Sequence, residues 1–146
     1  ARIDFKPAPV LLQKPKRRAS VFLLGGEKMI ILHCMKKAHW DFVKSRACWG
    51  HESVEKEGFV HCSPVGYFWR VAPLFRDEAE DLVLVCLDTE KLSSPVKWED
   101  PDGTGRKYPH VYGPVNTGAV TLALPFLRDA KGDFLKNPEL GGFPDE

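Results

Sequence analysis

Short runs of apolar, β-prone residues recur along this chain, and they predict a protein built mainly from strands. Six runs have the length and composition of strands, and they occupy residues 29–34, 59–62, 82–87, 96–99, 108–112 and 119–124. A further short strand is expected at residues 20–24, where Gly25 and Gly26 end it. Because strands outnumber helices and the helical patterns lie early, we expect an α+β fold.

Helical patterns are fewer and lie in the first half of the chain. One helix is expected where Trp40 and Val43 fall on a single stripe with lysines outside it. Ser63 and Pro64 supply an N-cap and a first-turn proline for a second helix, which Pro73 kinks or ends. The two helices are expected over residues 36–45 and 63–75, with an irregular segment at residues 48–54, a turn or short helix at 88–92 and a turn at 100–103.

Length and composition fit one globular domain. The chain has 146 residues, of which 43% are hydrophobic and 28% charged, a profile that excludes a disordered chain. Its net charge of +1 conceals two unequal parts: residues 1–28 hold seven basic against two acidic residues, a net of +5, and the rest holds fourteen against eighteen, a net of −4. We therefore divide the chain into a basic, proline-containing arm at residues 1–28, a domain at residues 29–127 and a polar C-terminal tail at residues 128–146.

The basic arm has two interpretations. Its run of lysines and arginines at residues 14–18 could attract phosphate groups or an acidic partner. A solvated leader explains the same composition, and we favour it because prolines interrupt the arm. The domain itself is mildly acidic, so a nucleic-acid partner is not expected.

No segment predicts a membrane span or an export signal. The longest apolar runs, around residues 21–24 and 29–32, are far shorter than the roughly 20 residues that a spanning helix needs. The four cysteines form no CxxC pair. We therefore expect reduced thiols in a cytoplasmic protein without membrane contact.

Three of the five histidines, His33, His61 and His110, lie in predicted strands. His33 and His61 each point to one strand face, and Cys34 and Cys62, which follow them, point to the other. Neighbouring residues of a regular strand cannot converge on one metal ion, so a zinc site built from these four side chains is not expected. We interpret the cysteines as small buried core residues.

The histidines carry stronger candidate chemistry. On the inner faces of neighbouring strands, His33 and His61 would form a compact polar site able to donate hydrogen bonds to phosphate or ribose oxygens. Core histidines that bond nearby backbone groups would have the same spacing. Glu57 adds a carboxylate that could orient His61 or bind a ribose hydroxyl, and a solvated charge at the start of a strand is an equal alternative.

An unusual segment at residues 108–114 combines two phenol rings, two prolines and the imidazole of His110. These groups suit the wall of a nucleotide or small-ligand pocket, and an aromatic core with a rigid turn would have much the same composition. Trp98 and Glu99 come just before the preceding turn. The sequence contains no P-loop, GxGxxG, nucleophile elbow or HExxH motif.

Four separated motifs resemble a known family. They are Glu-Gly-Phe-Val-His-Cys-Ser at residues 57–63, Pro-Val-Lys-Trp-Glu at 95–99, Tyr-Pro-His-Val-Tyr-Gly-Pro-Val-Asn at 108–116, and Leu32-His33 on the first strand, with Trp40 on the helix. Together they are similar to the family catalogued as domain of unknown function 952, from about residue 29 to about residue 127. The arm and the tail lie outside the resemblance.

The resemblance implies a fold and a ligand. The family is grouped with the ADP-ribosyltransferase-like proteins, among them the RNA 2′-phosphotransferases, which implies a bent, split β-sheet with a few helices and a cleft that holds NAD in relatives. By this analogy His33 matches the first-strand histidine that contacts the nicotinamide ribose, and His61 matches the second-strand histidine of a His-His site. The glutamate that activates the acceptor in many ADP-ribosyltransferases has no secure counterpart, and Glu99 is the one late candidate.

Three functional hypotheses follow. The first is a transferase that uses NAD or a related nucleotide, with catalytic roles for His33, His61 and His110 and no metal. The second is a domain that binds a nucleotide or small metabolite without catalysis. The third and least favoured is processing of an RNA phosphate, since Arg70 and Arg76 are the only central arginines. The residues expected to bind the small-molecule or nucleotide partner have polar or aromatic side chains: Glu57, Ser63, Trp98, Glu99 and Tyr112.

Overall fold

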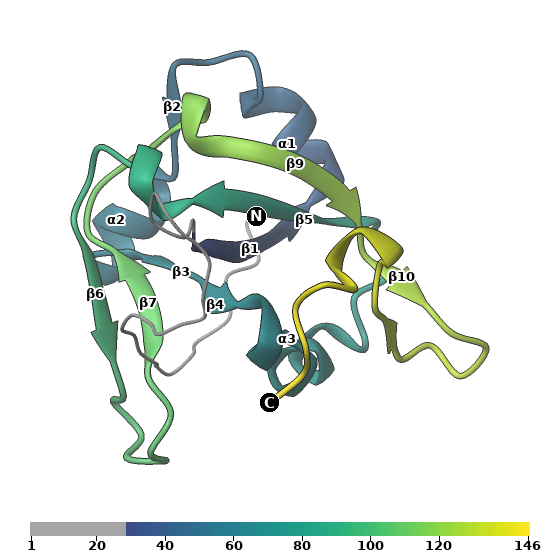
Figure 1. The fold of residues 1–146 in the computed structure, drawn as a ribbon. Coiled ribbons are helices and arrows are strands. Elements are labelled where there is room, and N and C mark those ends of the chain that lie inside the picture. The colour runs from purple at the N-terminus through teal and green to yellow at the C-terminus, as the bar shows by residue number, and fades with distance from the viewer. Residues whose placement is uncertain (1–28) are drawn as a thin grey trace.

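The largest sheet of the protein has four antiparallel strands. The computed structural model describes residues 29–146, so the expected strand at residues 20–24 and the basic arm lie outside the described residues. The sheet order is β4-β1-β5-β9 (Figure 1), and its strands are β1 (Ile30–Lys36), β4 (Ser63–Pro64), β5 (Leu82–Asp88) and β9 (Val120–Pro125). The strands predicted at residues 29–34, 82–87 and 119–124 are thus confirmed.

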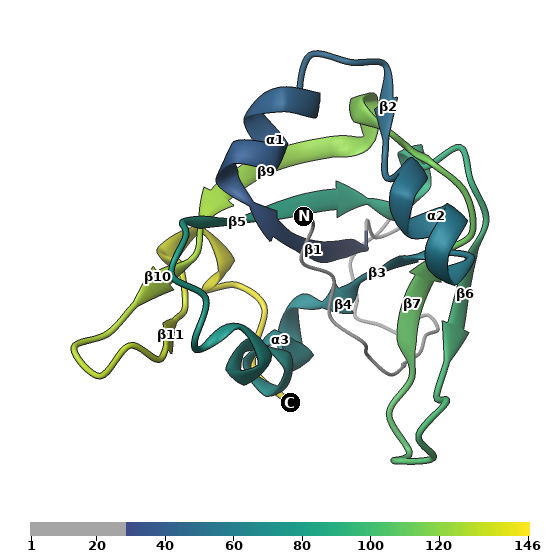
Figure 2. The same ribbon diagram turned by 180° about the vertical axis from the view of Figure 1, so that it is seen from behind.

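A second, three-stranded sheet contains a hairpin that projects from the body of the molecule (Figure 2). Its order is β3-β7-β6, with strands β3 (Val60–His61), β6 (Val96–Glu99) and β7 (Tyr108–Val111). They account for the strands predicted at residues 59–62, 96–99 and 108–112. Two short ribbons pair β2 (Cys48–Trp49) with β8 (Val115–Asn116), and β10 (Leu127–Arg128) with β11 (Phe134–Leu135).

The helices of the described chain are short. They are α1 (Lys37–Val43), α2 (His51–Glu57) and α3 (Phe68–Val71), with 3₁₀ turns at Val65–Tyr67, Ala72–Phe75, Thr89–Lys91, Thr117–Ala119 and Pro138–Leu140. Helix α1 confirms the first predicted helix, and its Trp40 and Val43 side chains are buried as expected. The structure is therefore α+β, with several small sheets and few helices.

Helix α2 corrects the prediction of an irregular segment at residues 48–54. It lies between Gly50 and Gly58, whose φ angles of 93° and 90° are in the left-handed region that glycine adopts without a steric cost. The amide of Val54 donates to the Gly50 carbonyl, and the amide of Gly58 donates to that of Val54. Ser53 is the one buried residue of α2, so the sequence has no apolar stripe to indicate a helix.

The prediction that Ser63 and Pro64 begin a helix is wrong. Both residues form β4, in which Ser63 pairs with Leu32 and Pro64 with Ile31 of β1. The Ser63 hydroxyl donates to the carbonyl of Pro64 (2.8 Å), so it caps no helix. Buried backbone groups at the edge of β1 need partners, and that need keeps residues 63–64 extended.

Two hydrophobic clusters lie on opposite faces of the four-stranded sheet. Leu32 and Cys34 of β1 belong to the first cluster, together with side chains of α3. Ile31 and Met35 belong to the second, together with Trp40 of α1 and residues of the three-stranded sheet. The alternation expected on the first strand is thereby confirmed. Because all of β5 is buried, one sheet serves both clusters.

The C-terminal segment packs onto the first cluster. Phe126 and Leu140 are buried there, and Phe134 and Phe143 pack against it. Residues beyond the expected boundary at 127 therefore contribute to the core of the described domain. Residues 29–146 include no helix with the length and apolar character needed to cross a membrane.

Candidate functional site

Three strands bring His33, His61 and His110 together. The Nδ1 of His33 donates to the backbone carbonyl of His61 (2.7 Å). His61 and His110 are paired residues of β3 and β7, and their ring centroids lie 5.3 Å apart. All three residues are at most 3% exposed. The structure thus places the three predicted histidines in one cluster, which we call the histidine cluster.

The histidine cluster lies where the two sheets part. Across the single residue Cys62 the chain passes from β3, which pairs with β7, to β4, which pairs with β1. At the crossing, the amide of Cys62 still donates to the carbonyl of Pro109. The hydrogen bond from His33 on β1 to the carbonyl of His61 on β3 also joins the four-stranded sheet to the three-stranded sheet. The three histidines therefore lie at the junction of the two sheets.

Each of two histidines is held by a carboxylate. Glu57 Oε1 lies 2.6 Å from Nε2 of His61, and Glu99 Oε1 lies 2.6 Å from Nδ1 of His110. Such short distances are typical of charge-assisted hydrogen bonds. Glu57 comes from the last turn of α2 and Glu99 from the end of β6. The cluster therefore contains two His–Glu pairs side by side.

Glu99 is further stabilised as an anion. Burial opposes its ionisation, but hydrogen bonds from His110 and Tyr112 outweigh that effect and hold the pKa of Glu99 below its ordinary value. The Tyr112 hydroxyl donates to the same oxygen (2.8 Å). Burial and the neighbouring Glu99 carboxylate raise the pKa of Tyr112 to about 12. Tyr112 is therefore a neutral donor and Glu99 an ionised acceptor near pH 7.

These acceptors fix where the ring protons lie. A backbone carbonyl only accepts, so the Nδ1 of His33 carries a proton. The ionised Glu99 also only accepts, so the Nδ1 of His110 is protonated. By the same logic the Nε2 of His61 faces Glu57 as the donor.

Phe59 is a member of the cluster that the sequence prediction missed. Its ring stacks on His110 (centroids 4.1 Å apart) and meets the edge of His61 (4.6 Å). The ring of Tyr112 is 5.1 Å away. Its position in the sequence could have indicated this contact, because Phe59 precedes His61 by two residues and so shares its strand face. Phe59 thus contacts both histidines of the β3–β7 pair.

Trp49 of β2 is the other neighbour that the prediction missed. Its ring lies 5.5 Å from that of His33. Trp49 is 2% exposed, and its Nε1 has no hydrogen-bond acceptor within residues 29–146. A buried donor without an acceptor is costly. No motif indicated this residue, because the two-residue strand that carries it has no periodicity.

Two predicted ligand-binding residues lie away from the polar cluster. Ser63 is fully buried and pairs with Leu32, on the side of the first hydrophobic cluster. Trp98 packs on the second hydrophobic cluster, on the strand face opposite its neighbours Lys97 and Glu99. The structure therefore brings together Glu57, Glu99, Tyr112 and the histidines, but neither Ser63 nor Trp98.

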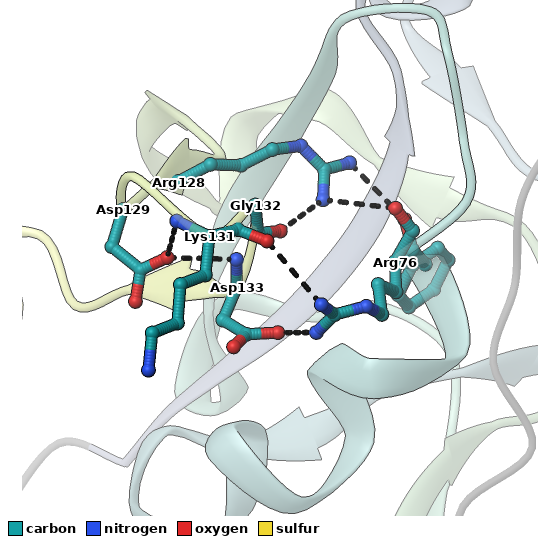
Figure 3. Close-up of polar contacts among 7 residues, drawn as sticks. Arg76, Arg128, Asp129, Lys131, Gly132 and Asp133 are labelled. Carbon is teal, nitrogen blue, oxygen red and sulfur yellow. Dashed lines mark hydrogen bonds and ion pairs between the residues drawn. The ribbon is translucent and has the colours of Figure 1, made fainter.

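The central arginines serve another part of the molecule. Arg70 donates to the backbone oxygen of Glu146. Arg76 pairs with Asp133 and donates to the carbonyl of Lys131, beside Arg128 (Figure 3). Arg76, Arg128 and Asp133 line a cavity of about 190 Å³ between the turn Ala72–Phe75 and the β10–β11 ribbon. Within residues 29–146, no recorded contact joins Arg70 or Arg76 to the histidine cluster.

Within that same range, no three His, Cys, Asp or Glu side chains have the arrangement of a metal site. All four cysteines are free thiols. That the protein works without a metal stays a prediction.

The family follows from a comparison with known proteins. A family model described as protein of unknown function (DUF952) matches residues 34–123. The chain belongs to the DUF952 family. The matched range includes both His–Glu pairs, and His33 lies directly before it. The family expected from the four motifs is thereby confirmed.

Solved structures of one other protein are similar to this chain. The crystal structure of protein CC0527 from Caulobacter crescentus is similar with a TM-score of 0.66 and 29% sequence identity, over 77% of this chain and 98% of that one. Its solution NMR structure is similar with a TM-score of 0.59 and 30% identity, over 77% and 94%. No curated protein matches the chain.

Proposed function

We propose that the histidine cluster is a nucleotide-binding site and that this DUF952 protein is an ADP-ribosyltransferase-like protein that takes NAD or a related nucleotide there. The observation that carries the proposal is the convergence of His33, His61 and His110 at the line where two sheets part. A split sheet with a polar line between its halves is the arrangement that the family resemblance implies. The ligand would lie along that line.

The side chains present fit the groups of a nucleotide. The carboxylates of Glu57 and Glu99 accept hydrogen bonds, as ribose hydroxyls require. Imidazoles donate to ribose or phosphate oxygens. The buried Nε1 of Trp49, which has no acceptor in the described chain, supplies a donor beside His33 for a carboxamide or base acceptor. NAD contains all of these groups.

The role of the protein in a transfer reaction is to hold and orient. NAD, when bound, supplies an ADP-ribosyl group whose carbon becomes electron-poor as nicotinamide leaves. His33, joined to the backbone of His61, positions the ribose at the sheet junction. The two carboxylates place negative charge beside the cluster, where a cationic centre develops. The rings of Phe59 and Tyr112 lie beside the cluster, 5.1 Å apart, and offer apolar faces to a bound base or nicotinamide ring.

Isothermal calorimetry with NAD and ADP-ribose tests the binding proposal. We expect saturable binding to the full chain and a loss of at least about tenfold in His61→Asn, since removal of one bond to a charged group costs roughly 1.5–3 kcal/mol. His51→Asn is the matched control because its exposed imidazole lies outside the cluster. Absence of heat with both ligands at millimolar concentration would contradict the proposal.

Binding without turnover is a second candidate, favoured by the burial of all three imidazoles. A buried imidazole exchanges protons with a ligand less readily than an open one. The two candidates differ in one measurement. Chromatography of NAD after incubation shows nicotinamide if the site transfers ADP-ribose, and intact NAD if it only binds.

A further inference from the structure

We propose that the cavity between the turn Ala72–Phe75 and the β10–β11 ribbon binds a small aromatic carboxylate, a single ring that carries one negative charge. The side chains that carry the proposal all line this cavity, and none of them belongs to the histidine cluster: Trp69, Pro73, Arg76, Arg128, Asp133 and Phe134. The inference therefore goes beyond the proposed function and does not depend on it.

The size of the cavity suits one ring. Its volume of about 190 Å³ exceeds the roughly 150 Å³ of an apolar protein cavity that binds benzene. Pockets for drug-sized ligands begin at roughly 300 Å³, so a nucleotide or a dinucleotide needs more room than this cavity offers. A monocyclic molecule with a small substituent fits it.

Part of the cavity lining is apolar and aromatic. Trp69 of α3, Pro73 of the adjoining turn and Phe134 of β11 contribute to it. Trp69 is 43% exposed, and the guanidinium carbon of Arg70 lies over its ring, 4.5 Å from the centroid. Aromatic rings attract one another beyond the area that they bury. An aromatic ligand would therefore cover the exposed part of Trp69 and gain from contact with it.

The charged side chains of the lining have a positive excess. They are the two guanidinium groups of Arg76 and Arg128 and the one carboxylate of Asp133, a net of +1. A cavity lined in this way favours an anionic ligand over a cationic one. The planar guanidinium fork matches the geometry of a carboxylate. The charge and the aromatic lining together indicate a ring with a carboxylate substituent.

The two arginines differ in how firmly their donors are engaged. The terminal nitrogens of Arg128 donate to four backbone carbonyls at 3.0–3.5 Å, so its guanidinium is a fixed part of the lining. Arg76 pairs with Asp133 and donates to the carbonyl of Lys131 at 3.3 Å (Figure 3). Exposed ion pairs contribute little to stability. A ligand carboxylate can therefore take the place of Asp133 on Arg76.

Solvent reaches the groups that would hold the ligand. The side chains of Arg76 and Asp133 are 50% and 47% exposed, and Trp69 is exposed to a similar extent. A ligand can enter without any movement of the backbone. Its ring would lie against Trp69 and Pro73, and its carboxylate would lie against Arg76. Binding exchanges one carboxylate for another and involves no covalent step.

Titration of the full chain with benzoate, followed by proton–nitrogen NMR spectra, tests the inference. Benzyl alcohol keeps the ring without the charge, and acetate keeps the charge without the ring. We expect benzoate to shift the indole Nε1–H signal of Trp69 and to saturate it at millimolar concentration, an affinity usual for so small a ligand. Benzyl alcohol should bind more weakly, and acetate should cause no saturable shift. Equal affinity for benzoate and benzyl alcohol, or absence of saturation with millimolar benzoate, would overturn the inference.

Two substitutions in the ion pair have opposite expected effects. Arg76→Met should weaken benzoate binding about two- to fivefold, the range of an exposed ion pair, and should leave benzyl alcohol binding unchanged. Asp133→Asn should strengthen benzoate binding, because it removes the carboxylate that competes for Arg76. A purely structural role of the pair would not produce this gain.

Lys56→Met on the exposed surface of α2 is the matched control, since it changes the net charge as Arg76→Met does but lies outside the cavity lining. It should bind benzoate as wild type does, and circular dichroism establishes that each variant is folded. If Asp133→Asn weakened benzoate binding as Arg76→Met does, or if neither variant changed it, Arg76 would not be the partner of the carboxylate and the inference would be wrong.

Discussion

One carboxylate oxygen, Oε1 of Glu99, organises much of the candidate site. It accepts hydrogen bonds from His110 and from Tyr112, and these bonds keep the pKa of Glu99 low against the opposing effect of burial. A folded-state pKa below the unfolded value means that the ionised form is favoured by folding. Stability from this source is complete above the unfolded pKa, about 4.3, and is lost as the pH falls through the folded pKa.

Glu99→Gln should therefore lose stability in a pH-dependent way. We expect the free energy of unfolding to fall by up to about 1 kcal/mol at pH 7, since the side chain is partly exposed and solvent screens it. Near pH 3 the difference from wild type should shrink. Urea unfolding at both pH values measures it, with Glu55→Gln on the exposed face of α2 as control. A difference of equal size at both pH values would contradict this account of Glu99.

The four thiols should differ in reactivity. Burial raises the pKa of Cys86 to about 12, and Cys34 and Cys62 are also buried, whereas Cys48 is partly exposed. Because the thiolate is the reactive form, a thiol reagent at pH 8 should label Cys48 rapidly and the others only after unfolding. Mass spectrometry of the native and urea-unfolded protein counts the labels. Rapid labelling of Cys86 in the native protein would count against the packing of β5.

At the residue scale, strand alternation predicted part of the site. It set His33 and His61 on faces opposite to Cys34 and Cys62, and the structure joins the two histidines. Glu57 also contacts His61 as expected, but it does so from the last turn of α2 and not from the start of a strand. The link from His110 to Glu99 could not be predicted in the same way. These residues are brought together by the register of the β6–β7 hairpin. The turn that connects the two strands is long, so the sequence does not determine which residues pair.

At the element scale, the two glycines that bound α2 offer a matched pair. Both have positive φ, but a Cβ on Gly50 would lie 2.9 Å from Cγ2 of Val60, whereas one on Gly58 meets nothing within 4 Å. Gly58→Ala should cost about 1 kcal/mol for the left-handed backbone alone. Gly50→Ala should cost about 1 kcal/mol more because Val60 must also move. Thermal unfolding of both variants measures the difference, and equal losses would mean that Val60 adjusts freely.

Arg128 joins two elements through backbone carbonyls (Figure 3). Its guanidinium donates to the carbonyls of Phe75 at the end of a 3₁₀ turn, of Glu78 after that turn, and of Gly132 in the β10–β11 ribbon. Arg128→Met keeps the stem and removes these donors, so we expect a loss of about 1–3 kcal/mol. Lys131→Met, a change at an exposed neighbour, is the control. Urea unfolding midpoints of the two variants measure the loss of stability. If Arg128→Met lost no more stability than Lys131→Met, the three carbonyls would have found other donors.

Elements with strong periodicity were predictable, and short ones were not. The runs that became β1, β5 and β9 contain enough β-prone residues to be recognised. The two-residue strands β2, β4 and β8 contain no period at all, and Ser63-Pro64 has the same local pattern as a helix start. There the decisive factor was the open edge of β1, which is a property of the assembled sheet.

At the scale of the whole molecule, the order β4-β1-β5-β9 and the separate order β3-β7-β6 could not be derived from residue patterns. Family resemblance implied a split sheet, and the pairing of β3 and β4 with different partners is the local event that separates the two sheets here. The histidine cluster depends on that event, because His33 and His110 come from different sheets.

The position of the cluster across two sheets has a consequence for amide hydrogen exchange. Strand β5 is buried along its whole length and bonded on both sides, so its amides should exchange only through global unfolding. The β6–β7 hairpin has β6 at a sheet edge and should exchange through local opening. A ligand that ties His33 to His110 would join the two regions. Added nucleotide should then slow exchange in β6 and β7 while leaving the rates in β5 set by global stability, and mass spectrometry of deuterated peptides would detect the difference.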